Sequence, residues 1–291
     1  MKTYISRFWF SILLLWISLA VAQAAPKRLL VVTTTTGFRH DSIPTAENII
    51  QQLATRSGLF TVDFVRQPPD EPKNPGANAS DAEKLEYTQM EARWEAELRL
   101  ALEKLSPASL AHYDGVAFVS TTGDLPIPDR AGFLDWIRQG HGFIGIHAAS
   151  DTFHGWPDYI QMLGGEFKRH GRQVSVVCLN QDPSNPATSG LPNAWKIDQE
   201  EIYQFKNYDP SKVHELLVLD RHPETGAPGR FPVSWCKSYG AGRVFYTSLG
   251  HRQDMWNDDP GLKDRKNDPA VSKAFQNHVL GGIEWALGIQ P

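Results

Sequence analysis

The chain alternates unbroken apolar runs with segments in which apolar residues recur at helical spacing. Residues 29–35 (LLVVTTT) form a β-branched run that is typical of a strand buried on both faces of a parallel sheet. After a polar loop, the apolar positions of residues 44–53 recur at helical spacing, and Gly58 follows as a helix stop. Further strands are predicted at residues 60–65, 115–121, 143–147, 174–179, 215–219, 232–239 and 243–248. This alternation favours an α/β fold built from βαβ units.

Two more helices and one inserted segment complete the pattern. Residues 129–139 and 271–287 each place apolar side chains along one helical face. Residues 67–80 (QPPDEPKNPGANAS) predict an exposed loop and residues 82–105 a charged amphipathic helix. We therefore expect one domain, residues 25–291, with a surface insertion at about 67–105. The stripe expected to be buried on the inserted helix consists of Leu85, Met90, Trp94, Leu98 and Leu102.

The first 24 residues have the pattern of a secretory signal peptide. Lys2 and Arg7 precede an apolar run at residues 8–22, and residues 22–24 (AQA) offer a small-residue cleavage site. The run is shorter than the roughly 20 residues that span a bilayer. We therefore expect export to the periplasm or the cell exterior, with no membrane insertion after cleavage. An uncleaved N-terminal anchor is the alternative.

Charge and composition narrow the class of ligand. The 291 residues include 29 basic and 33 acidic ones, which gives a net charge of −4. Without residues 1–24 the balance is 27 basic against 33 acidic residues, a net charge of −6. This mildly acidic balance argues against a nucleic-acid partner or an anionic membrane, and it favours a small neutral ligand. Some of the aromatic residues, 11% of the chain, are candidates for stacking on a sugar, although burial is their commoner role.

Neither cysteine chemistry nor serine chemistry is favoured by the motifs. Cys178 and Cys236 lie in apolar, strand-like runs, where a buried free thiol is at least as well supported as a disulfide. Residues 145–149 (GIHAA) have the form of the strand-to-helix elbow that exposes a hydrolase nucleophile, but His147 stands where serine or cysteine would be needed. Serine or cysteine hydrolysis is therefore disfavoured.

Three histidines follow three different predicted strands: His40, His147 and His251. In an open α/β sheet, ligands bind beyond the carboxyl ends of the strands, so these side chains are expected to converge. Imidazoles act as general bases or as metal ligands, and a carboxylate such as Asp41 or Asp151 would fix their tautomers. Each histidine alone is more often a turn or hydrogen-bonding residue. The chain has no HExxH motif and no close Cys/His cluster, so the prediction of a divalent metal such as zinc depends on the expected convergence of the three histidines.

Six long motifs, in order from about residue 27 to residue 288, are similar to those of the trehalose-utilisation (ThuA-like) family. The resemblance implies the fold of class I glutamine amidotransferases, a flavodoxin-like three-layer sandwich with a mostly parallel sheet. It also implies carbohydrate metabolism, in particular the processing of trehalose and related or oxidised sugars. Those amidotransferases carry cysteine at the elbow where this chain has His147, so glutaminase activity is not implied. The motifs are TTGFRHDSI (35–43), YDGVAFVSTTGD (113–124), GFIGIHAASDT (142–152), EIYQF (201–205), PVSWCKSYGAGRVFYTSLGH (232–251) and HVLGGIEWALG (278–288).

The family's motif histidines correspond to His40, His147 and His251, and its acidic motif residue corresponds to Glu201. The resemblance implies that His147, His40 and Glu201 are catalytic, or that the three histidines hold a divalent metal. Glu201 lies in the run DQEEI, where a solvated carboxylate is an equally good interpretation. The expected substrate contacts are Thr36, Arg39, Asp41, Thr122, Asp151, Trp156, Tyr203 and His251.

Three functions stay open at this point. The first is a secreted enzyme, a hydrolase, lyase or isomerase, that acts on a trehalose-like or keto sugar. The second is a non-catalytic glycan-binding or interaction module, whose affinity would depend on exposed aromatic residues. The third is an amidotransferase-type hydrolase, which would need an accessible thiol at Cys178 or Cys236.

Overall fold

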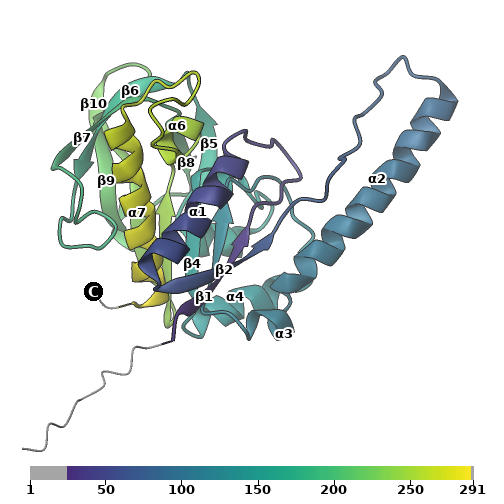
Figure 1. Cartoon of the computed structure of the whole chain (residues 1–291), viewed down its shortest axis with the longest axis horizontal. Coiled ribbons are helices and arrows are strands. Elements are labelled where there is room, and N and C mark those ends of the chain that lie inside the picture. The colour runs from purple at the N-terminus through teal and green to yellow at the C-terminus, as the bar shows by residue number, and fades with distance from the viewer. Residues whose placement is uncertain (1–24, 290–291) are drawn as a thin grey trace, which may run out of the picture.

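Successive residues of the first strand, β1 (Lys27–Val32), are buried on opposite faces of the sheet. Leu29 and Val31 belong to one apolar cluster, whereas Leu30 and Val32 belong to another, and all four side chains are fully buried. A strand with two buried faces needs a covering layer on each side, which gives three layers. The computed structural model describes residues 25–289, and these have that architecture (Figure 1).

The main sheet has nine strands in the order β2-β1-β3-β4-β11-β10-β9-β6-β7. Its first five strands are parallel, and the other four continue it as antiparallel neighbours. The remaining parallel strands are β2 (Phe60–Val65), β3 (Gly115–Val119), β4 (Gly142–Ile146) and β11 (Gly242–Thr247). The antiparallel strands are β10 (Pro228–Tyr239), β9 (His214–Arg221), β6 (Val174–Asn180) and β7 (Ala194–Glu200). A separate antiparallel ribbon pairs β5 (Glu166–His170) with β8 (Tyr203–Lys206).

Helices cover both faces of the sheet, and their apolar residues fill the two clusters. One face carries α1 (Ile43–Ser57), α6 (Gln253–Trp256) and α7 (Pro269–Leu287). The other face carries the last turns of α2 (Asp81–Leu102), with α3 (Pro107–Leu110), α4 (Arg130–Arg138) and α5 (Pro157–Leu163). Three short 3-10 helices are η1 (Glu103–Leu105), η2 (His147–Asp151) and η3 (Pro210–Lys212). The predicted α/β fold is thereby confirmed.

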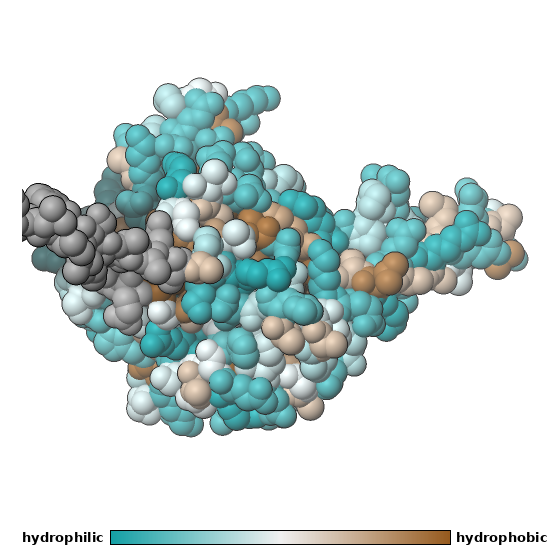
Figure 2. Space-filling view, turned by 60° about the horizontal axis from the view of Figure 1, so that its bottom comes forward, coloured by the Kyte–Doolittle hydropathy of each residue, from teal (hydrophilic) through white to brown (hydrophobic). Residues whose placement is uncertain are grey.

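The inserted helix α2 projects away from the body (Figure 1). Its C-terminal part packs through Trp94, Leu98 and Leu102, which are buried. The predicted stripe is wrong for Leu85 and Met90, whose exposed fractions are 61% and 44%. These two residues precede the buried C-terminal part, in the half of the helix that projects from the body, and the arm in Figure 2 is mostly hydrophilic with scattered apolar side chains.

The predicted strands and helices, the inserted helix included, agree with the structure to within a few residues at their ends. Strands β5, β7 and β8 and helices α3, α5 and α6 were not predicted. The predicted signal peptide, residues 1–24, lies outside the described residues. Within residues 25–289, none of the helices combines the length and the apolar character needed to cross a bilayer.

Candidate functional site

The parallel strands bring the three histidines to one edge of the sheet. His147 directly follows β4, His251 follows β11, and His40 lies in the loop between β1 and α1. Because β1, β4 and β11 run parallel, their carboxyl ends meet at the same edge. Glu201 directly follows β7 and reaches the same place from the antiparallel half of the sheet.

His40, His147, His251 and Glu201 form a compact group, called here the histidine cluster. One ligand atom from each residue lies within 4.8 Å of the others. The Nε2 atoms of His147 and His40 are 3.1 Å apart. The Oε1 atom of Glu201 lies 3.4 Å from His251 Nδ1 and 3.8 Å from His147 Nε2. Three imidazoles and a carboxylate in this arrangement could hold a divalent metal ion.

His147 is held in one orientation by its backbone and by one hydrogen bond. Its φ of +51° is a left-handed conformation that is rare outside glycine, as in the elbow predicted from the sequence. Its Nδ1 atom donates to the carbonyl oxygen of Ser248 at 2.8 Å, which fixes the tautomer and leaves a lone pair on Nε2. The Tyr203 hydroxyl, 3.1 Å away, donates to that lone pair.

The unpaired nitrogens of the cluster fit a bound cation. If His40 Nε2 donates to His147 Nε2, the buried Nδ1 atom of His40 keeps a lone pair with no donor among the described residues. If it does not donate, two lone pairs face each other at 3.1 Å, and a cation between them would remove that repulsion. The Nδ1 atom of His251 is also buried, and its 3.4 Å contact with Glu201 Oε1 lacks the geometry of a hydrogen bond.

All three imidazoles of the cluster are neutral at pH 7. Burial, followed by repulsion from His251 and His170, lowers the pKa of His40 to about 4. Burial also lowers the pKa of His251 to about 4, with a further contribution from His170. The pKa of His147 is lowered well below the usual value, mainly because the side chain is completely buried. Neutral imidazoles have the free lone pairs that a metal ion requires.

Two residues that the sequence interpretation missed support the cluster. His170, at the end of β5, donates from Nδ1 to the Gly171 carbonyl at 2.8 Å, and the same atom lies 2.9 Å from Oε2 of Glu201. Glu200 is completely buried, and its Oε1 atom accepts hydrogen bonds from the backbone N–H groups of Gly250 (3.0 Å) and His251 (2.7 Å). Burial raises the pKa of the Glu200 carboxyl to about 8 and also raises the pKa of Glu201.

Some predicted substrate contacts lie near the cluster. Tyr203 contacts it directly, through the hydrogen bond to His147. Asp41 is exposed, and it lines, together with His251 and Arg252, a polar cavity of about 310 Å³. Asp151 forms an ion pair with His154 at 2.7 Å rather than with a cluster histidine.

Other predicted contacts have structural roles. The Thr122 hydroxyl donates to the Phe38 carbonyl, and the Arg39 guanidinium donates to the Thr33 carbonyl. Thr36 is exposed and faces the inserted helix rather than the cluster. Trp156 is only 8% exposed and packs against Phe153 and Tyr159 in the aromatic core, so it offers no free face to a sugar.

Both cysteines are free and buried, with exposed fractions of 0% for Cys178 and 3% for Cys236. Burial raises the pKa of each thiol to about 12, so neither is ionised near neutral pH. Only thiolates are efficient nucleophiles. The geometry therefore argues against an amidotransferase-type hydrolase that uses either thiol.

Comparison with known proteins identifies the family. The family described as ThuA, trehalose utilisation, matches residues 28–286. The chain belongs to this family. Membership supports a carbohydrate-related function for this ThuA protein, and a comparison with curated proteins gave no match.

Solved structures share the ThuA fold. A ThuA-like protein from Parabacteroides merdae ATCC 43184 is 22% identical, with a TM-score of 0.62 over 91% of this chain and 92% of its own. A ThuA-like protein from Bacteroides uniformis ATCC 8492 is 19% identical, with a TM-score of 0.57 over 91% and 93%. A β-galactosidase from Bacillus circulans sp. alkalophilus is 8% identical, with a TM-score of 0.50 over 94% of this chain but 32% of its own. At these low sequence identities, the comparisons show a similar fold and nothing more.

Proposed function

We propose that this ThuA protein is an exported, zinc-dependent enzyme that acts on a trehalose-like or oxidised (keto) sugar. The observation that carries the proposal is the histidine cluster, whose four ligand atoms lie within 4.8 Å of one another. Three imidazole ligands with a carboxylate beside them suit a catalytic zinc, which keeps its fourth position open for substrate. The family match supports a sugar as the substrate, and the signal-peptide pattern of residues 1–24 supports export.

His40, His147 and His251 would hold the metal, which leaves a coordination position for the sugar, and the metal when bound would polarise a sugar carbonyl or hydroxyl oxygen. The hydrogen bond from Nδ1 to Ser248 keeps His147 in one tautomer and orientation, and the Tyr203 hydroxyl would release Nε2 when the metal binds. The Glu201 carboxyl, whose pKa burial raises, would lie beside the metal as the proton-transfer group, with His170 Nδ1 2.9 Å from its outer oxygen.

The polar cavity beside the cluster suits a hydroxyl-rich ligand. His251 forms part of its wall, so a sugar bound there would lie next to the cluster. The Asp41 carboxylate and the Gln173 and Gln253 side chains also line the cavity and can hydrogen-bond sugar hydroxyls. The rest of the lining is Ser42, Arg252, Asp254, Leu262, Lys263 and Asp264.

The test combines metal analysis with turnover. Protein lacking residues 1–24 is purified without added metal, and its zinc content is measured by plasma mass spectrometry. Wild type and His147→Ala are then assayed on a panel of trehalose, glucosides and keto sugars. His112→Ala is the matched control because His112 is exposed and lies outside the cluster.

We expect about one zinc per chain and measurable turnover in wild type and His112→Ala, and loss of both in His147→Ala. Removal of zinc with a chelator should abolish turnover, and added zinc should restore it. Wild type with neither bound metal nor turnover would overturn the proposal. Turnover that is indifferent to chelation and to His147→Ala would overturn the role of the cluster.

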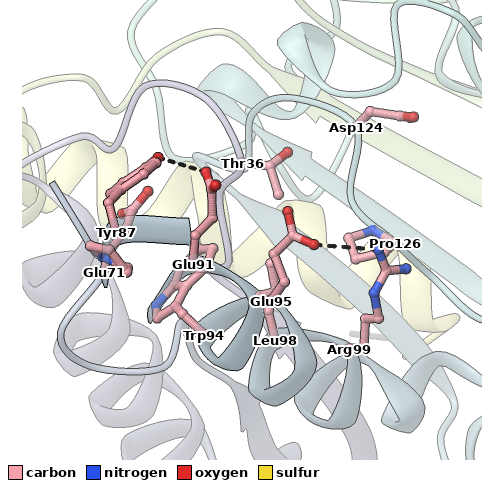
Figure 3. Close-up of a pocket in the computed structure, with 11 residues that line it drawn as sticks. Thr36, Glu71, Tyr87, Glu91, Trp94, Glu95, Leu98, Arg99, Asp124 and Pro126 are labelled. Atoms are coloured by element: carbon pink, nitrogen blue, oxygen red, sulfur yellow. Dashed lines mark hydrogen bonds and ion pairs between the residues drawn. The ribbon is translucent and has the colours of Figure 1, made fainter. Parts of the chain in front are cut away.

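One observation favours a second function, glycan binding without catalysis. A cavity of about 270 Å³ lies between α2 and the carboxyl edge of the sheet (Figure 3). Tyr87 and Trp94 of α2 line it beside several carboxylates, and aromatic faces combined with carboxylates suit sugars. The Tyr87 hydroxyl donates to Glu91 at 2.6 Å, which holds the ring in place.

Calorimetric titration with trehalose and with oligosaccharides separates the two functions. A glycan-binding module would lose sugar affinity in Tyr87→Ala and keep it in His147→Ala, with no turnover in either protein. An enzyme would lose turnover in His147→Ala. Tyr87 is half-buried on the projecting helix, so its replacement leaves the sheet and the cluster intact.

A further inference from the structure

A third cavity, of about 490 Å³, has three lysines in its wall. Lys206 comes from β8, Lys212 from η3 and Lys237 from β10, so three separate elements bring the ammonium groups to one space. No member of the histidine cluster lines this cavity. It is called here the lysine cavity. Its remaining lining residues are His154, Pro157, Ile160, Gln161, Gly164, Glu166, Asn207 and Asp209.

The three lysines differ in how their charge is balanced. Lys206 pairs with Glu166 at 3.0 Å, and Lys212 pairs with Asp209 at 3.4 Å. The Lys237 ammonium donates to the carbonyl oxygen of Gln161 at 2.7 Å, and no carboxylate of the described chain lies within 4.0 Å of it. A half-buried ammonium that donates only to a neutral carbonyl has no opposite charge beside it, so an anion would bind there favourably.

Glu166 does not balance Lys237, because other groups already satisfy its charge. The carboxylate is buried, with a side-chain exposure of 3%, and it accepts from His154 Nδ1 and Asn207 Nδ2 at 2.6 Å each. His154 lies between two carboxylates, since its Nε2 atom contacts Asp151 at 2.7 Å. Both ring nitrogens therefore donate, and the imidazole carries a positive charge.

The charges in the lysine cavity thus sum to a local excess of positive charge. Three ammonium groups and the His154 imidazolium face the carboxylates of Glu166 and Asp209, and Asp151 pairs with His154 from outside the lining, so four positive charges meet three negative ones. The whole chain, by contrast, has a net charge of −4. Burial lowers the pKa of Lys237, and repulsion from Lys212 lowers it further, so these two ammonium groups act on each other across the cavity. An anion between them would relieve that repulsion.

We propose that the lysine cavity is a binding site for a small organic anion, whose carboxylate or phosphate group lies between Lys237 and Lys212. Two sources share this chemistry, a sugar acid and a phosphate ester. The apolar wall at Pro157 and Ile160 would pack against the carbon skeleton of the ligand. This site is independent of the histidine cluster, so it can exist whether or not the protein is a zinc enzyme.

The experiment is calorimetric titration of the chain lacking residues 1–24 with glucuronate, with inorganic phosphate and with neutral glucose, in low-salt buffer. Lys237→Gln and Lys212→Gln remove one ammonium group each. Lys196→Gln is the matched control, because Lys196 lies on β7 outside the cavity with a side-chain exposure of 68%. Circular dichroism checks that each variant is folded.

We expect saturable binding of glucuronate, of phosphate or of both, and weaker binding at higher salt. The dissociation constant should rise at least tenfold in Lys237→Gln and several-fold in Lys212→Gln, and it should not change in Lys196→Gln. Binding of glucuronate alone identifies a sugar-acid site, and binding of phosphate alone identifies a phosphate-ester site.

Three results would overturn the proposal: no saturation by either anion at millimolar concentration, glucose binding as tightly as glucuronate, or equal affinities in all variants. If Lys237→Gln fails to fold, Lys212→Gln decides, because the Lys212 side chain is 72% exposed and its replacement does not disturb the core. Zinc content and sugar turnover are not read in this experiment, so its failure leaves the proposed enzyme untouched.

Discussion

Replacing Glu200 by alanine is expected to loosen the loop that carries His251. The Oε1 atom of Glu200 accepts hydrogen bonds from the backbone N–H groups of Gly250 and His251, which lie in the loop after β11. Gly250 has a φ of +118°, a conformation that favours glycine, so the loop has few alternatives that keep His251 in place. Glu200 thus holds the backbone of a cluster residue without belonging to the cluster.

The expected loss in free energy of unfolding follows from the two hydrogen bonds. Leaving a buried donor unpaired costs about 1–3 kcal/mol, so two donors set a range of about 2–6 kcal/mol for the loss in free energy of unfolding. His251 N is only partly buried, so water reaching it would put the loss toward the lower end. Glutamine keeps an acceptor oxygen at the same position. Because burial raises the pKa of Glu200 to about 8, the carboxyl is mostly neutral at pH 7, and the neutral amide is a close replacement.

The assay is urea denaturation at pH 7, combined with zinc titration of the metal-free protein. Glu200→Ala should lose stability in the range above and bind zinc more weakly than wild type, whereas Glu200→Gln should stay close to wild type in both measurements. If Glu200→Gln were as damaged as Glu200→Ala, a negative charge rather than an acceptor would be what the loop requires, and this reasoning would be refuted.

Three further predictions concern other parts of the chain. Leu98→Ala should lower the free energy of unfolding by about 2–5 kcal/mol in urea denaturation, because Leu98 is 1% exposed, yet leave zinc content unchanged. Burial lowers the pKa of His278 to about 4, so its contribution to stability is present above the ordinary pKa of 6.5 and is lost as pH falls toward 4. The loss is at most about 3 kcal/mol, and His278→Gln should show a correspondingly smaller drop in stability between pH 7 and pH 4. Gly242→Ala should lower the melting temperature, because a Cβ there would lie 2.0 Å from the Ile137 carbonyl oxygen, a contact that side-chain rotation cannot relieve; an unchanged melting temperature would contradict this.

The elements that could be predicted are those in which the local pattern of apolar residues shows which faces are buried. Strand β1 is apolar at consecutive positions, which requires cover on both faces, and the parallel strands β3 and β4 share this property. Their parallel arrangement then places His40, His147 and His251 at one edge. The convergence of these histidines could therefore be anticipated from short stretches of sequence.

The parts that escaped prediction depend on contacts between distant residues. Strand β5 (EFKRH) is mostly polar, and it forms a strand because it pairs with β8, more than thirty residues later. His170 lies at the end of β5, so its contact with Glu201 could not be inferred before that pairing was known. Leu85 and Met90 have helical spacing, but spacing does not show how far the body extends beneath a helix. Trp156 was predicted to contact substrate because it lies near a strand end, but this position did not reveal that Phe153 and Tyr159 bury it.

The projecting helix α2 also bears on how the chain can change in evolution. Its outer half projects away from the sheet and the other helices (Figure 1). Substitutions there change few contacts that the sheet or the histidine cluster requires, so they carry little penalty for folding of the body. Tyr87, in the wall of the Figure 3 cavity, lies in this tolerant region. The insertion can therefore diversify rapidly while the chemistry at the carboxyl edge of the sheet stays the same.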